Sequence, residues 1–136
     1  MRAGHLVSLC CLASSGFELR RDGWACLRVP GTSLSKQSGT AVTVPVQIPD
    51  CPGGPSHLLL NADVPVGEVL RVTALDATGL HSLSEGFITG NGVRLAVQPS
   101  SSAKQEFLHD VTGKVAFRFV LEQGTRLYAW ELRCGQ

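Results

Sequence analysis

The stretch GKVAFRFVLEQGTRLYAWELR, residues 113–133, carries the clearest fold signal in the chain. Its first half places four large apolar residues at alternate positions, Val115, Phe117, Phe119 and Leu121. Arg118 lies on the opposite side, so this half predicts a strand with one buried face. Gly124 then turns the chain into residues 126–133, where Tyr128, Trp130 and Leu132 share a face. We predict two strands joined as a closing hairpin.

Two segments upstream repeat this alternation. Leu70, Val72 and Ala74 are interleaved with polar residues, and the strand ends at a turn over residues 76–79. Residues 42–48 have valine or isoleucine at every second position, which predicts a strand with one buried face. Pro45 within it lacks an amide donor, so we expect that strand at a sheet edge.

The remaining segments indicate further strands and turns. Leu58, Leu59 and Leu60 are consecutive, which predicts burial on both faces of their strand. The pair Asp22-Gly23 predicts a tight hairpin, and residues 90–92 predict a turn before a strand over 93–97. Residues 103–109 allow at most a turn or two of helix.

These segments together predict an all-β fold with very little helix. Roughly seven or eight strands at about ten-residue spacing indicate a two-sheet antiparallel β-sandwich, jelly-roll-like in arrangement. A chain of 136 residues corresponds to one domain. We assign the sandwich to residues 16–136 and treat residues 1–15 as an N-terminal segment that forms a first strand.

Composition excludes several classes of partner. Hydrophobic residues make up 43% and charged residues 17%, which is typical of a globular chain rather than a disordered one. The formal charge of +1 provides no overall basic footprint for nucleic acid and no polybasic membrane patch. No apolar stretch reaches the ~18 residues of a membrane-spanning helix. We therefore predict a soluble protein without a nucleic-acid partner.

The N-terminus shows a weak resemblance to a signal peptide. Residues 6–13 form a short apolar run after Arg2, and small residues follow. The run is short for a signal peptide, and no N-x-S/T glycosylation site occurs in the sequence. We favour a first strand here over a secretion signal.

The five cysteines, Cys10, Cys11, Cys26, Cys51 and Cys134, include no C-x-x-C pair. Their odd number leaves at least one thiol unpaired in a monomer. Buried or idle thiols are the favoured interpretation, a single disulfide is the second, and a metal site is the least favoured.

Motifs for catalysis and cofactor binding are missing from the sequence. It contains no G-x-S-x-G, no phosphate-binding glycine loop and no H-E-x-x-H. Its four histidines have no metal-ligand spacing, and its carboxylates, such as Asp63 and Glu131, form no recognisable catalytic pair. We predict no enzyme activity, no cofactor and no metal.

Three aromatic residues are the candidate ligand-binding residues: Trp24, Tyr128 and Trp130. Sugar-binding sandwiches stack aromatic rings on the apolar faces of pyranosides. Core packing is the favoured interpretation for Tyr128 and Trp130, because they share a strand face with Leu132. Trp24 follows a tight turn and is the more exposed candidate.

Several signatures occur in a familiar order: R-R-D-G-W at residues 20–24, L-L-L-N-A-D at 58–63, L-R-V-T-A-L-D at 70–76, and the closing stretch. Residues 16–134 resemble the C-terminal β-sandwich of glycosidase-like proteins with a five-bladed propeller, the inulinase and invertase architecture. The catalytic carboxylates of such proteins belong to the propeller, which has no counterpart here, so no catalytic residue carries over.

These observations lead to two functional hypotheses. The first is a non-catalytic accessory module of glycosidase-like origin that binds carbohydrate. The alternative is a protein-interaction or structural domain, including a truncated orphan of a larger enzyme, which would use the strand over residues 41–48 or an exposed face.

Overall fold

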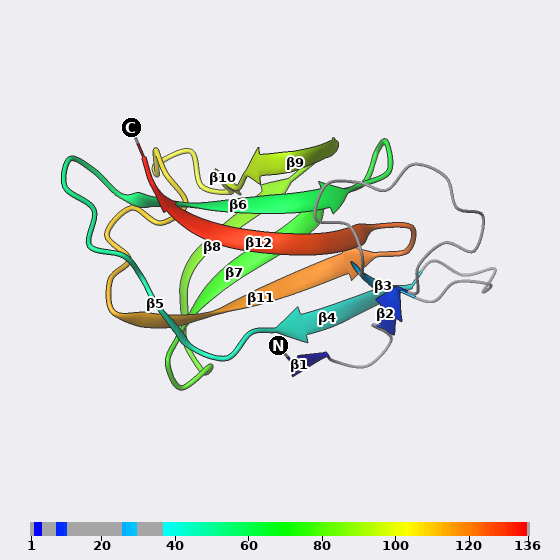
Figure 1. Ribbon diagram of the computed structural model, residues 1–136, viewed down its shortest axis with the longest axis horizontal. Coiled ribbons are helices and arrows are strands. Elements are labelled where there is room, and N and C mark those ends of the chain that lie inside the picture. Colours follow the sequence, from blue (N-terminus) through cyan, green and yellow to red (C-terminus); the bar gives the residue numbers. More distant parts are fainter. Residues whose placement is uncertain (1, 4–7, 11–25, 30–36, 136) are drawn as a thin grey trace.

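A computed structural model shows an all-β sandwich and describes residues 2–3, 8–10, 26–29 and 37–135 (Figure 1). No helix occurs among these residues. The strands are β1 (Arg2–Ala3), β2 (Ser8–Cys10), β3 (Cys26–Arg28), β4 (Ser38–Val42), β5 (Val46–Gln47), β6 (Ser56–Asp63), β7 (Leu70–Asp76), β8 (Ser82–Ile88), β9 (Asn91–Ala96), β10 (Gln98–Pro99), β11 (Lys114–Glu122) and β12 (Arg126–Cys134).

The strands form two antiparallel sheets. Sheet A has the order β1-β4-β11-β7-β8-β10, and β5 pairs with β11 beyond the end of β4. Sheet B has the order β2-β3-β12-β6-β9. This confirms the predicted antiparallel β-sandwich. The described part of the N-terminal segment contributes one short strand to each sheet, β1 beside β4 and β2 beside β3.

The core lies between the sheets and follows the predicted alternation. On β11 the four predicted apolar residues, Val115, Phe117, Phe119 and Leu121, are each 0% exposed. They face the even-numbered residues of β6, Leu58, Leu60 and Ala62, within one cluster. Leu59 between them is only half-buried. The prediction that the leucine run is buried on both faces is therefore wrong for the outer face.

The turn between β7 and β8 is confirmed. The amide of Gly79 donates to the carbonyl of Asp76 at 2.9 Å, and the two strands pair in sheet A. The Thr78 hydroxyl and the amides of Leu80 and His81 donate to the Asp76 carboxylate. These hydrogen bonds lower the pKa of Asp76, the bond from Thr78 contributing most.

The predicted closing hairpin is wrong. β11 and β12 follow each other along the chain (orange and red in Figure 1) but lie in different sheets. Gly124 adopts φ +92° and the amide of Thr125 donates to the carbonyl of Glu122, so the turn carries the chain from one layer to the other. Because each strand buries one face, stacking the two faces buries more apolar surface than pairing their edges.

The predicted strand over residues 42–48 is interrupted. Val46 and Ile48 pack on the core as predicted, but the faces of Thr43 and Val44 are reversed. β4 ends at Val42, Val44 is 62% exposed, and Thr43 is buried. The Thr43 hydroxyl accepts a hydrogen bond from the amide of Phe117 at 3.0 Å, and the Thr43 amide donates to the Phe117 carbonyl. These bonds hold Thr43 inward, and Pro45 then separates β4 from β5.

A β-bulge changes the face assignment on β12. The pairing register with β6 shifts between Leu127 and Ala129. As a result, Leu127, Trp130 and Leu132 pack on the core, and Tyr128 is not part of that cluster. The prediction that Tyr128 shares a face with Trp130 is therefore wrong. The predicted hairpin at Asp22-Gly23 lies outside the described residues.

Candidate functional site

The outer face of sheet B, the face that points away from the core, carries the candidate site. Residues on β6 alternate, so Leu59 and Asn61 point outward while Leu58 and Leu60 point to the core. On β12 the pairing partners of these outward residues are Glu131 and Ala129, respectively. The outer surface of β6 is thus continuous with that of β12.

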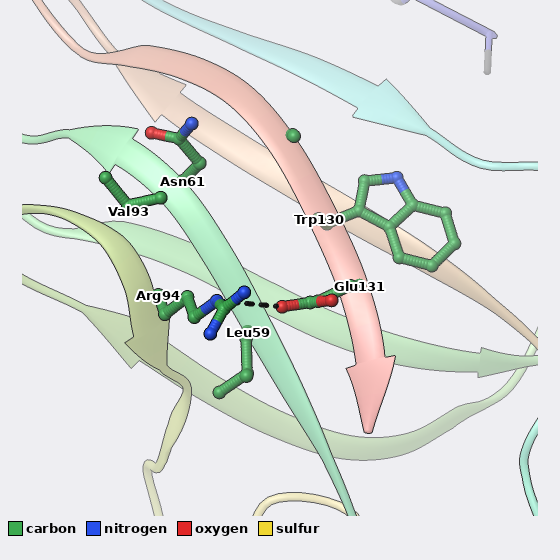
Figure 2. A pocket seen from close by; sticks show the side chains of 7 residues that line it. Leu59, Asn61, Val93, Arg94, Trp130 and Glu131 are labelled. Carbon is green, nitrogen blue, oxygen red and sulfur yellow. Dashed lines mark ion pairs between the residues drawn. The ribbon is translucent and has the colours of Figure 1, made fainter. Parts of the chain in front are cut away.

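A hollow of about 210 Å³ lies on this face, over β6, β9 and β12 (Figure 2). Leu59, Val93 and Ala129 contribute apolar surface to it, and Asn61, Arg94 and Glu131 contribute polar groups. The register shift of β9 against β6, between Leu60 and Ala62, is where Val93 and Arg94 meet Asn61. The hollow therefore combines apolar surface with an amide, a guanidinium group and a carboxylate.

Glu131 is shared by two arginines. Arg94 Nε lies 3.5 Å from Glu131 Oε1, and Arg133 Nε lies 3.6 Å from Glu131 Oε2. The side chains of Arg94, Glu131 and Arg133 are 49%, 43% and 52% exposed, respectively. Exposed ion pairs contribute only about 0–1 kcal/mol each. These groups therefore add little to stability and are accessible to a ligand.

Of the three predicted site residues, the structure describes Tyr128 and Trp130, both on β12, and only Trp130 packs against the core cluster. Trp24 lies outside the described residues. Tyr128 is half-buried at the bulge of β12. The Trp130 indole packs edge-to-face on Phe117 in the other sheet, with 5.6 Å between ring centroids. Figure 2 shows this ring pointing away from the Arg94–Glu131 pair.

From the sequence we did not predict that the polar residues of the hollow lie together. Asn61 interrupts an apolar run, Arg94 alternates with Val93 and Leu95, and Glu131 was one carboxylate among several. The side chains of Arg94 and Glu131 are exposed on their strands, and Asn61 is a buried residue of β6. Only the pairing of β12 with β6 and of β6 with β9 brings the three together.

A second hollow, of about 440 Å³, lies beside β8 and is lined by Ser82, Leu83, Ser84, Glu85, Ser100, Ser101 and Lys104. Lys104 Nζ is 3.0 Å from Ser84 Oγ, a contact that superficially resembles a Ser–Lys dyad. A nucleophilic serine must give its proton to a neutral base. Here Ser84 donates to the carbonyl of Phe107, and Lys104 approaches the same carbonyl at 3.5 Å. The cluster anchors the loop before β11 to β8.

Cysteines and histidines have structural partners in the described part of the chain. Cys51 and Cys134 form a disulfide with an S–S distance of 2.06 Å, and Cys26 is also disulfide-bonded. The favoured interpretation of idle thiols is therefore wrong for these three, because the fold brings distant cysteines together. His57 Nδ1 lies 3.4 Å from Glu106 Oε2. Among the described residues, no group of three or more His, Cys, Asp or Glu could hold a metal ion.

The described residues form no helix, and so none that could cross a membrane.

Comparison with protein-family models, with curated proteins and with solved structures finds no match to this chain.

Proposed function

We propose that this protein is a non-catalytic carbohydrate-binding module that takes its ligand in the hollow on the outer face of sheet B. The observation that carries this proposal is the combination found there. Leu59, Val93 and Ala129 offer apolar surface, Arg94 and Glu131 offer exposed hydrogen-bonding groups, and the buried Asn61 lies beneath them in the lining. Sugars present both apolar C–H faces and hydroxyl groups, so they match a shallow site of this composition.

The hydrogen-bonding groups suit vicinal hydroxyls. The guanidinium group of Arg94 donates through a planar fork, and the carboxylate of Glu131 accepts at two oxygens. Arg94 and Glu131 already hold each other at 3.5 Å, so a ligand meets an oriented donor beside an acceptor. The resemblance of residues 16–134 to the accessory sandwich of glycosidase-like proteins agrees with a role in binding rather than catalysis.

The disulfides support an oxidising setting for this function. Disulfides persist in oxidising environments outside the reducing cytosol. Carbohydrate-binding accessory modules also meet polysaccharides outside the cell. We therefore place the protein in a secreted or otherwise oxidising compartment. From the sequence we favoured a first strand over a secretion signal at the N-terminus, so this proposed location differs from that interpretation.

The test is calorimetric titration of the full chain with neutral and acidic oligosaccharides, followed by Arg94→Ala and Glu131→Ala. We expect millimolar or tighter binding to at least one glycan, and a loss of at least tenfold in each variant. Arg71→Gln is the matched control, because Arg71 is an exposed arginine paired with a glutamate, Glu122, in the other sheet. No binding, or binding that survives both substitutions, would overturn the proposal.

A protein-interaction domain is the second candidate, through the segment 41–48 that we assigned to a protein partner from the sequence. Val44 is the exposed apolar residue of that segment, at 62% exposure between β4 and β5. Val44→Asp would weaken binding to a protein partner and leave glycan binding unchanged. Loss of glycan binding in Val44→Asp, with the fold intact, would place the glycan site at β4 instead.

A further inference from the structure

The outer face of sheet B also carries a row of like charges. Arg28 on β3 and Arg126 on β12 are directly opposite each other in the antiparallel register, and both are exposed. Like charges at such positions are destabilising. Asp63 on β6 is the cross-strand partner of Arg126 on its other side, so its negative charge offsets one of the two positive charges. The sequence therefore keeps a charge arrangement that folding does not favour.

Positive charge exceeds negative charge over this face. Among the described residues, its arginines are Arg28, Arg94, Arg126 and Arg133. The carboxylates on its strands are Asp63 and Glu131, and a third, Glu106, contacts His57, the cross-strand partner of Arg133. Four arginines therefore stand against three carboxylates on the described part of this face.

The arginines are spread along the sheet instead of converging on one point. Arg126 and Arg133 are at opposite ends of β12, and the hollow with Arg94 lies between them. Seven steps along a strand at about 3.3 Å each span about 23 Å. The face therefore matches an extended ligand with repeated negative groups better than a single small anion.

We infer that the ligand is an acidic polysaccharide lying along β12, with its carboxylate or sulfate groups on the arginines and its hydroxyls on Glu131. This inference rests on the proposed function. Guanidinium groups bind carboxylate and sulfate oxygens through paired N–H donors.

A nucleic acid, the other extended polyanion, fits this face less well. Single strands bind through aromatic side chains on which the bases stack. Among the described residues that line the hollow, the one aromatic residue, Trp130, packs its ring on Phe117 in the core. The Glu131 carboxylate accepts hydrogen bonds from the hydroxyls of a polysaccharide, and a deoxyribose-phosphate backbone has no such hydroxyls. The mixed charge of the face favours a sugar acid.

The test compares polymers with the same backbone and different charge. The full chain is titrated with dextran and carboxymethyl dextran, with hydroxyethyl cellulose and carboxymethyl cellulose, and with a single-stranded oligothymidylate, all in 100 mM NaCl. We expect the acidic member of a pair to bind at least tenfold more tightly than the neutral one. Arg28→Gln and Arg126→Gln should each weaken binding of the acidic polymer at least threefold and leave binding of the neutral polymer unchanged. Arg71→Gln should change neither, and the urea midpoint of each variant checks its fold.

The outcomes separate this inference from the proposed function. Equal binding of neutral and acidic polymers would overturn the acidic ligand and leave carbohydrate binding standing. Tighter binding of the oligothymidylate than of either acidic polymer, with loss in the same arginine variants, would assign the face to nucleic acid. Binding to none of the polysaccharides would overturn the inference together with the function on which it rests.

Discussion

Removal of the Cys51–Cys134 disulfide by the double substitution Cys51→Ala and Cys134→Ala is expected to destabilise the fold strongly. The bond joins the loop before β6 to the last residue of β12, across a sequence separation of 83 residues. In the chain-entropy description, closing a loop of that length removes about 15 cal/mol/K from the unfolded chain. The expected loss is therefore about 4.5 kcal/mol at 25 °C.

The assay is urea unfolding at equilibrium, followed by far-UV circular dichroism and tryptophan fluorescence. Substitution is necessary, because a reductant would also open the disulfide of Cys26. The unfolded double variant is less constrained and exposes more surface, so its m-value should rise as its free energy of unfolding falls. A loss below about 1 kcal/mol would refute the chain-entropy reasoning. A large loss with an unchanged m-value would place the effect in the native state instead.

Three further predictions concern the core, a close backbone contact and pH. Phe117→Ala should lower the free energy of unfolding by about 4 kcal/mol in urea titration, because the ring is fully buried. Gly86→Ala should cost about 1–3 kcal/mol and lower the melting temperature, because an added Cβ would meet the backbone carbonyl of Gln98. The pKa of Asp76 is lowered, chiefly by Thr78, so its ionised form stabilises the fold above about pH 4 and this stabilisation fades as the pH falls further. Asp76→Asn should therefore be less stable than the wild type at neutral pH. The difference in urea midpoint between the two proteins should narrow below about pH 4. A difference that does not depend on pH would contradict this prediction.

Local patterns predicted the strands well where one face of a strand is buried. β11 and β7 begin and end within a residue or two of their predicted bounds, because their apolar residues alternate without interruption. The strand over residues 42–48 was predicted only in part although its alternation is equally regular, because Val46 and Ile48 pack on the core but Val44 does not. A hydrogen bond from the Phe117 amide holds Thr43 inward, and no local pattern signals a contact 74 residues away.

The candidate site was less predictable than the fold. Core packing was the favoured interpretation for Trp130, and its ring does pack on Phe117. The polar residues that line the hollow are of common types, and Asn61, Arg94 and Glu131 come from three strands. A site built from one residue per strand has no spacing that a sequence motif could capture.

The sequence by itself determined the all-β class, the buried face of β11 and the turn over residues 76–79, because alternation and turn chemistry act between near neighbours. Only the tertiary structure decided that β11 and β12 belong to different sheets and that Arg28, Arg126 and Asp63 stand in one row. Alternation specifies which face of a strand is buried but not which strand becomes its neighbour. That choice depends on how all the apolar faces pack together around one core.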